Sequence, residues 1–156
     1  HDHRSRFEEI AKQKWENVVV LADGEICGLA EEGALAFTEI AMLTGRYFHL
    51  LDYRHGPIVV SGEKTLTIIL LRPDEKELQL AMVRDVCSHG GPVITISEQS
   101  ESVPGVAAHI QIANNSWFAT WGIPFIYTAQ MIALLKAIEL GNNPDAPQGL
   151  DAYITL

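Results

Sequence analysis

The sequence has few basic residues, few cysteines and no long apolar run. It contains 11 Lys and Arg against 20 Asp and Glu, which gives a formal net charge of −9 at pH 7. Because nucleic acids and anionic membranes are bound through clusters of Lys and Arg, this balance argues against both as partners. The 2 cysteines are too few for a disulfide framework. We find no apolar run of about 18 residues and no secretory leader pattern, so we expect a soluble, cytoplasmic protein.

The glycine-rich loops that bind phosphate in nucleotide-binding proteins are also missing. The segment "ADGEICG" has only Gly24 and Gly28, and Asp23 and Glu25 would repel a phosphate at the start of the following helix. It therefore matches neither the dinucleotide fingerprint nor the P-loop. Cys27 opens that helix, a position that lowers the pKa of a thiol, but a buried structural thiol is the simpler interpretation.

Metal sites and serine nucleophiles are not indicated either. No serine or cysteine lies on a Gly-x-Ser-x-Gly turn. His49, His89 and His109 have no partners at the spacing of metal ligands. We therefore expect an activity that uses neither a metal nor a nucleotide cofactor.

What the sequence does contain is the pattern of one compact domain. The chain has 156 residues, 47% of them hydrophobic, which is enough for a real core. Short β-rich runs alternate with helical stretches, which is typical of a parallel sheet covered on both faces. We expect an α/β fold, a three-layer αβα sandwich over residues 1–156. Predicted strands are 17–22, 47–52, 65–71 (central), 92–97 and 108–112, and predicted helices are 7–16, 29–43, 78–89 and 124–141.

The predicted helix 29–43 carries two candidate site residues. Glu32 and Glu39 are seven residues apart, with Ala36 between them, so both carboxylates lie on one stripe of the helix. Apolar neighbours predict partial burial of Glu39, which together with the like charge would raise its pKa toward a value suited to proton transfer. A solvated helix face is the alternative, and the spacing alone does not decide between them.

The third candidate is His55, in the segment "YRHGP". One interpretation is structural: the imidazole caps a short helix that begins at Pro57, since proline is favoured in a first helical turn. The other is functional: Gly56 and Pro57 fix the backbone so that the imidazole projects from a strand end and takes part in acid–base chemistry. In an open α/β sheet such a site is expected at the carboxyl ends of the strands, in the loops after Ala22, Asp52 and Leu71.

Three segments, "EEGALAFTEIA", "YRHGP" and "PFIYTAQMIALLKAIELGNNPDAPQGL", together resemble the sugar isomerase (SIS) family of phosphosugar-processing proteins. The likeness extends from about Asn17 to the end and is greatest to the C-terminal SIS half of two-domain synthases, isomerase/deaminases and deglycases. It implies a five-stranded parallel sheet of flavodoxin-like topology. It also implies that Glu39 shuttles a proton between C1 and C2 of an open-chain sugar phosphate or amino-sugar phosphate. His55 would then assist ring opening, often in the site of a neighbouring subunit, and Glu32 would be a further active-site carboxylate.

The sequence also departs from the family pattern. Ala36 and Asp151 stand where synthase relatives have lysines, so Schiff-base chemistry is not expected, and the serine and threonine loop that binds phosphate in the first SIS half is missing. We therefore expect the chain to be a C-terminal SIS half. Its expected partners are an N-terminal SIS half, further copies of itself in a homo-oligomer, or both. Three functions stay open: an isomerase, deaminase or deglycase part, a non-catalytic sensor of sugar phosphates, and a purely structural half.

Overall fold

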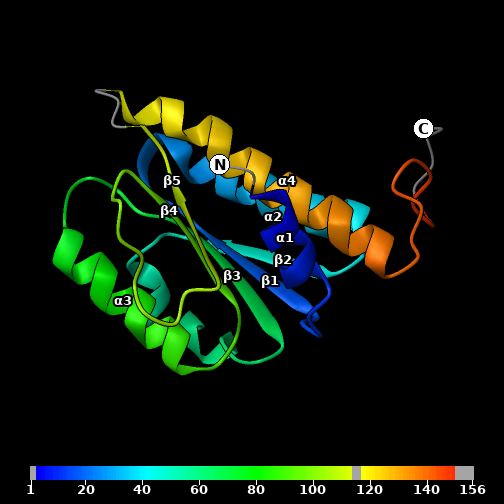
Figure 1. The fold of residues 1–156 in the computed structure, drawn as a ribbon, viewed down its shortest axis with the longest axis horizontal. Coiled ribbons are helices and arrows are strands. Elements are labelled where there is room, and N and C mark those ends of the chain that lie inside the picture. The colour runs from blue at the N-terminus through cyan, green and yellow to red at the C-terminus, as the bar shows by residue number, and fades with distance from the viewer. Residues whose placement is uncertain (1–2, 114–116, 150–156) are drawn as a thin grey trace.

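The computed structural model describes residues 3–113 and 117–149 and contains one five-stranded sheet in which every pairing is parallel (Figure 1). The strand order is β2-β1-β3-β4-β5, so the order reverses between β1 and β3. The strands are β1 (Asn17–Leu21), β2 (Thr44–Phe48), β3 (Thr65–Leu70), β4 (Val93–Ser97) and β5 (Ala108–Gln111). The α-helices are α1 (Arg4–Ala11), α2 (Cys27–Ile40), α3 (Lys76–Ser88) and α4 (Gly122–Glu139). The α/β class, the parallel sheet and the central position of β3 are confirmed.

Helical segments cover both faces of the sheet, as Figure 1 shows. One core layer lies between the sheet and α1, α2 and α4, and it holds Val18 and Val20 of β1. The other lies between the sheet and α3, and it holds Val19 and Leu21. Successive side chains of a strand point to opposite faces, which is why neighbouring valines of β1 enter different layers. The predicted three-layer sandwich is therefore confirmed.

The connection between β2 and β3 differs from the sequence-based prediction. The strand predicted at 47–52 begins at Thr44 and ends at Phe48, and two 3-10 helices follow, η2 (Asp52–His55) and η3 (Pro57–Val60). The strand is polar because β2 lies at the sheet edge and pairs only with β1, which leaves much of it exposed. The apolar residues at the end of the predicted strand, Leu50 and Leu51, instead lie just before η2, where Leu50 is buried in the second core layer and Leu51 packs against it.

The last helix, α4, is strongly apolar together with the short helix before it. Phe118–Glu139, which includes the 3-10 helix η4 (Phe118–Trp121), is long and apolar enough by length and composition to cross a membrane. The most apolar 18-residue stretch of this segment is 39% buried inside the domain. Phe125, Ala129 and Ile132 belong to the first core layer. Apolarity of this kind is weak evidence for a membrane span, because a core helix passes the same test.

Candidate functional site

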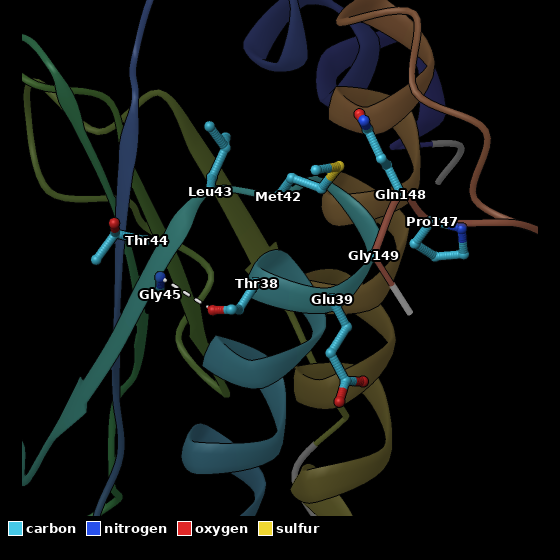
Figure 2. A pocket seen from close by; sticks show the side chains of 9 residues that line it. All are labelled: Thr38, Glu39, Met42, Leu43, Thr44, Gly45, Pro147, Gln148 and Gly149. Carbon is cyan, nitrogen blue, oxygen red and sulfur yellow. Dashed lines mark hydrogen bonds between the residues drawn. The ribbon is translucent and has the colours of Figure 1, made fainter. Parts of the chain in front are cut away.

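Glu39 lines a cavity of about 630 Å³ at the end of α2. The other walls are residues 42–45, which lead into β2, and residues 147–149 of the C-terminal segment. Figure 2 shows Glu39 on the last turn of α2, with its carboxylate extending away from Met42 and Gln148. The predicted partial burial of Glu39 is wrong, since its side chain is exposed. The reason is that α2 buries Ala34, Ala36 and Phe37 against the sheet and α4 and turns Glu39 outward.

The wall of this cavity is built by a close approach of α2 and β2. A Cβ atom on Gly45 would lie 1.9 Å from the carbonyl oxygen of Ala34, so only glycine allows the two backbones to come this near. The Gly45 amide donates a hydrogen bond of 3.4 Å to the Thr38 hydroxyl, drawn as a dashed line in Figure 2. Glu39 is thereby held next to the first residues of β2, at the amino end of this strand. The sequence had indicated the carboxyl ends of the strands instead.

Glu32 lies on the same helical stripe as Glu39, as predicted, but not in the same cavity. Its side chain is exposed on α2, two turns before Glu39, and it is not among the residues that line the cavity. Ala36, which stands between them where the family resemblance implies a lysine in synthases, is 5% exposed and packs in the first core layer. The two carboxylates therefore do not form a pair within the described chain. The other departure, at Asp151, lies outside the described residues.

His55 is the last residue of η2, and the residues before it are held by contacts with the rest of the domain. Tyr53 is buried, and its hydroxyl lies 2.8 Å from the Ser61 hydroxyl. Arg54 donates to the Asp85 carboxylate of α3 over 2.5 Å. His55 itself is exposed, so its imidazole is presented at the surface by an anchored segment.

The two residues after His55 set the path of the backbone. Gly56 has a φ of 134°, a conformation that favours glycine. Pro57 begins η3, as predicted from its place in a first helical turn. No side chain caps this helix, so the capping interpretation of His55 is wrong.

Glu39 and His55 lie on opposite sides of the sheet. The α2 residues around Glu39, including Ala36 and Phe37, belong to the first core layer. Leu50 and Tyr53, which anchor the segment before His55, belong to the second. One copy of the chain therefore does not bring the predicted base and the predicted histidine together.

A cluster that the sequence reading missed lies at the start of α2. The Cys27 sulfur is 3.8 Å from Nε2 of His49, and Nδ1 of His49 is 3.2 Å from the Asp23 carboxylate. The predicted lowering of the Cys27 pKa is wrong, because burial and the charges of Asp23 and Glu31 raise it. The sequence carried a signal only for Asp23, which follows the predicted strand 17–22. His49 lies inside the predicted strand 47–52, and only the observed end of β2 at Phe48 places it after a strand. Within residues 3–113 and 117–149, no three or more His, Cys, Asp or Glu side chains are placed so that they could hold a metal ion.

The chain has the fold of the sugar isomerase domains of phosphosugar enzymes. Tagatose-6-phosphate ketose/aldose isomerase of Escherichia coli superimposes with a TM-score of 0.77 and 25% identity, over 95% of this chain and 42% of that one. Glucosamine-6-phosphate deaminase of Thermotoga maritima does so with a TM-score of 0.72 and 24% identity, over 99% of this chain and 46% of that one. No family model matches the chain.

The curated relatives are also named as enzymes of phosphorylated sugars and amino sugars. The chain is 26% identical over 141 residues to D-galactosamine-6-phosphate deaminase AgaS of Escherichia coli, which covers 85% of this chain and 37% of the deaminase. It is 28% identical over 167 residues to glutamine–fructose-6-phosphate aminotransferase of Methanococcus maripaludis, which covers 99% of this chain and 26% of that protein. The resemblance to the sugar isomerase family is confirmed, and the chain spans less than half the length of each of these relatives.

Proposed function

We propose that the chain is the SIS part of an enzyme that isomerises, deaminates or deglycates a sugar phosphate or amino-sugar phosphate. The observation that carries this proposal is the position of Glu39, an exposed residue that lines a cavity of about 630 Å³, in a chain whose homologues act on hexosamine and hexose phosphates. Glu39 is the general base that moves a proton between C1 and C2 through an enediol or enolamine. Such a transfer needs one positioned base and neither a metal nor a nucleotide.

His55 opens the sugar ring in this proposal, and it comes from a second copy of the chain. The placement of Glu39 and His55 on opposite sides of the sheet supports this arrangement. His55 is also exposed at the tip of η2, so it is free to enter a neighbouring site. The assembly is therefore a homo-oligomer in which each active site combines Glu39 of one copy with His55 of another, and Glu32 supports the site from α2.

The phosphate group is bound by an N-terminal SIS half. Two observations support this part of the proposal. The chain spans 37% of the deaminase and 42% of the isomerase chain that it matches. Its loop after β1 also contains Asp23 and Glu25, where a phosphate would need neutral or basic groups.

The chain, residues 1–156, is one SIS domain, and the enzyme works in the cytoplasm.

Deuterium exchange in D₂O tests this proposal directly. Hexose and hexosamine 6-phosphates are incubated with the chain, alone and mixed with the phosphate-binding half of a homologous two-domain enzyme, and proton NMR follows exchange at C2 for aldoses and at C1 for ketoses. We expect exchange only in the mixture, and we expect Glu39→Gln to lower its rate by about a hundredfold or more while calorimetry still detects ligand binding. Exchange in Glu39→Gln at the rate of the unmodified chain would contradict the role of Glu39 as base.

A non-catalytic sensor of sugar phosphates is the second candidate. It is favoured by Ala36, which is buried and apolar where synthase relatives have a lysine. The same experiment separates the two functions, since a sensor binds the sugar phosphate in the mixture without any exchange in the unmodified chain. If Glu39 and His55 are both freely replaceable without loss of binding or exchange, the chain is a structural half only.

A further inference from the structure

Three side chains at the opposite end of α2 from Glu39 form a chain of hydrogen bonds. Cys27 is the first residue of α2, and its sulfur lies 3.8 Å from Nε2 of His49. Nδ1 of the same imidazole lies 3.2 Å from Oδ1 of Asp23. This carboxylate oxygen also accepts a hydrogen bond of 3.0 Å from the Leu50 amide, which fixes its position. Nucleophile, base and orienting carboxylate are thus arranged as in enzymes with an activated thiol.

The sheet brings these groups together. β1 and β2 are parallel neighbours, with Leu21 paired to Phe48 at their carboxyl ends. Asp23 comes two residues after Leu21 and His49 one residue after Phe48, so both emerge at the same edge. η1 (Gly24–Ile26) then returns the chain so that α2 begins with Cys27 above them. This edge also lies next to the reversal of strand order between β1 and β3, where open α/β sheets place ligand sites.

The hydrogen-bond partners determine which way a proton moves. An ionised carboxylate only accepts hydrogen bonds, so Nδ1 of His49 carries the hydrogen that it shares with Asp23. In the neutral imidazole Nε2 is then the acceptor, and it faces the Cys27 sulfur. Burial, Asp23 and Glu31 raise the pKa of Cys27, so little thiolate forms without help. The reactivity of this thiol therefore depends on a nearby base.

We propose that Cys27, His49 and Asp23 form a thiol-modification site whose substrate is a small disulfide. The Cys27 sulfur attacks one sulfur of the reagent, a new S–S bond forms, and the S–S bond of the reagent breaks. His49 takes the thiol proton through Nε2 and returns it to the departing thiolate. Cys27 is oxidised to the mixed disulfide and the departing sulfur is reduced to a thiol, so no further oxidant is needed.

The charges around Cys27 select the kind of disulfide. Asp23 and Glu31 both lie close enough to raise the pKa of Cys27. Glu31 is four residues after Cys27 on the same face of α2, and it also raises the pKa of the neighbouring Tyr47. Arg72 is near this edge, but it is engaged with the Asp74 carboxylate over 2.8 Å and 2.9 Å. The site therefore favours cationic or neutral disulfides over anionic ones.

Single-thiol variants of the chain test the proposal. Cys87→Ala leaves Cys27 as the one thiol, and Cys27→Ala leaves Cys87, whose pKa is raised by burial alone. Each variant is treated with three disulfides that differ in charge: cystamine is cationic, hydroxyethyl disulfide is neutral and dithiodipropionate is anionic. Intact mass spectrometry then measures the rate at which each mixed disulfide forms. We expect Cys27 to react fastest with cystamine and slowest with dithiodipropionate, and we expect Cys87 to show a weaker preference.

The role of His49 is tested in the Cys87→Ala background. His49→Asn keeps a side-chain N–H for Asp23 but cannot accept the thiol proton, and we expect it to slow the Cys27 reaction about tenfold or more. Asp23→Asn is expected to slow it less, because the base stays in place without its orienting charge. His49 is exposed, so the replacement is tolerated, and circular dichroism verifies the fold. The proposal would be overturned if a folded His49→Asn variant reacted as fast as the chain with His49. It would also be overturned if Cys27 in the Cys87→Ala chain showed no preference for cystamine.

Discussion

At the scale of single residues, Lys136 is an unusual group because it is a lysine buried in the core. It is 3% exposed, and its ammonium donates to the carbonyl oxygens of Ala11 and Gln13 over 3.1 Å and 2.7 Å. The same ammonium lies 4.2 Å from the centre of the Trp15 ring. These contacts tie the segment between α1 and β1 to α4. Burial nevertheless lowers the pKa of Lys136, while the charge of Glu139 partly opposes this.

Replacing Lys136 by methionine keeps most of the side-chain volume and removes the donor. The buried carbonyl oxygen of Ala11 and the partly buried one of Gln13 lose their partner, so we expect the free energy of unfolding to fall by about 2 kcal/mol at pH 7. Because the pKa of Lys136 is lower in the folded chain than the ordinary 10.5, the unfolded chain binds more protons at pH values between the two. The contribution of Lys136 to the free energy of unfolding therefore increases as pH rises through this window. The deficit of Lys136→Met should therefore grow between pH 7 and pH 10 in urea unfolding. A deficit that shrinks with pH would show that the charged form is favoured in the fold.

Glu39 and Glu32 share a stripe of α2 but not a cavity, and this separates their expected roles. Glu39→Gln should reduce deuterium exchange in the mixed SIS halves by about a hundredfold or more, the usual contribution of a general base. Glu32→Gln removes a carboxylate outside the cavity wall, so we expect exchange to fall by less than about tenfold. NMR exchange rates at saturating substrate measure both variants. Equal losses in the two would mean that Glu32 also contacts the reacting atoms in the assembled site.

At the scale of elements, the contact between α2 and β2 is determined by one glycine. A Cβ on Gly45 would overlap the backbone carbonyl of Ala34 at 1.9 Å, so α2 and β2 would have to move apart. We expect Gly45→Ala to destabilise the fold by about 3 kcal/mol or more, the upper range for overpacking. Gly28, near the start of α2, is the matched control, since a Cβ there meets nothing within 4 Å.

Gly28→Ala should be neutral or stabilise the fold by up to about 1 kcal/mol, because alanine is the better helix former. Urea unfolding measures both glycine variants. A Gly45→Ala protein as stable as the unmodified chain would mean that α2 and β2 separate easily, and the wall of the Glu39 cavity would then not be fixed by this contact.

At the scale of the whole molecule, α4 presents an apolar stripe that the described chain does not cover. Ile123 and Tyr127 are 73% and 58% exposed, and Ile138 on the same stripe is 58% exposed. Exposed apolar surface of this kind is typical of an association surface. We predict that the stripe contacts another SIS domain, either a second copy or the N-terminal half.

Tyr127→Glu places a charge in this stripe and should weaken association, and sedimentation velocity over a range of concentrations measures the effect. Leu78→Glu is the matched control, because Leu78 is 53% exposed on α3, on the other face of the sheet. We expect the control to sediment like the unmodified chain. If Leu78→Glu dissociates the particle and Tyr127→Glu does not, the association surface lies on the α3 face.

The sequence by itself determined the fold class, because the patterns that predict strands and helices are local. The apolar, β-branched run of β3 predicted a central strand. Gly56 and Pro57 predicted the short helix that begins at Pro57. It also singled out Glu39 and His55, through their resemblance to a known pattern. Only the tertiary structure decided that these residues lie on opposite sides of the sheet, that Glu39 is exposed, and that Cys27, His49 and Asp23 meet. Such relations depend on strand order, register and close backbone approach, which bring together residues far apart in the chain and leave no local pattern in the sequence.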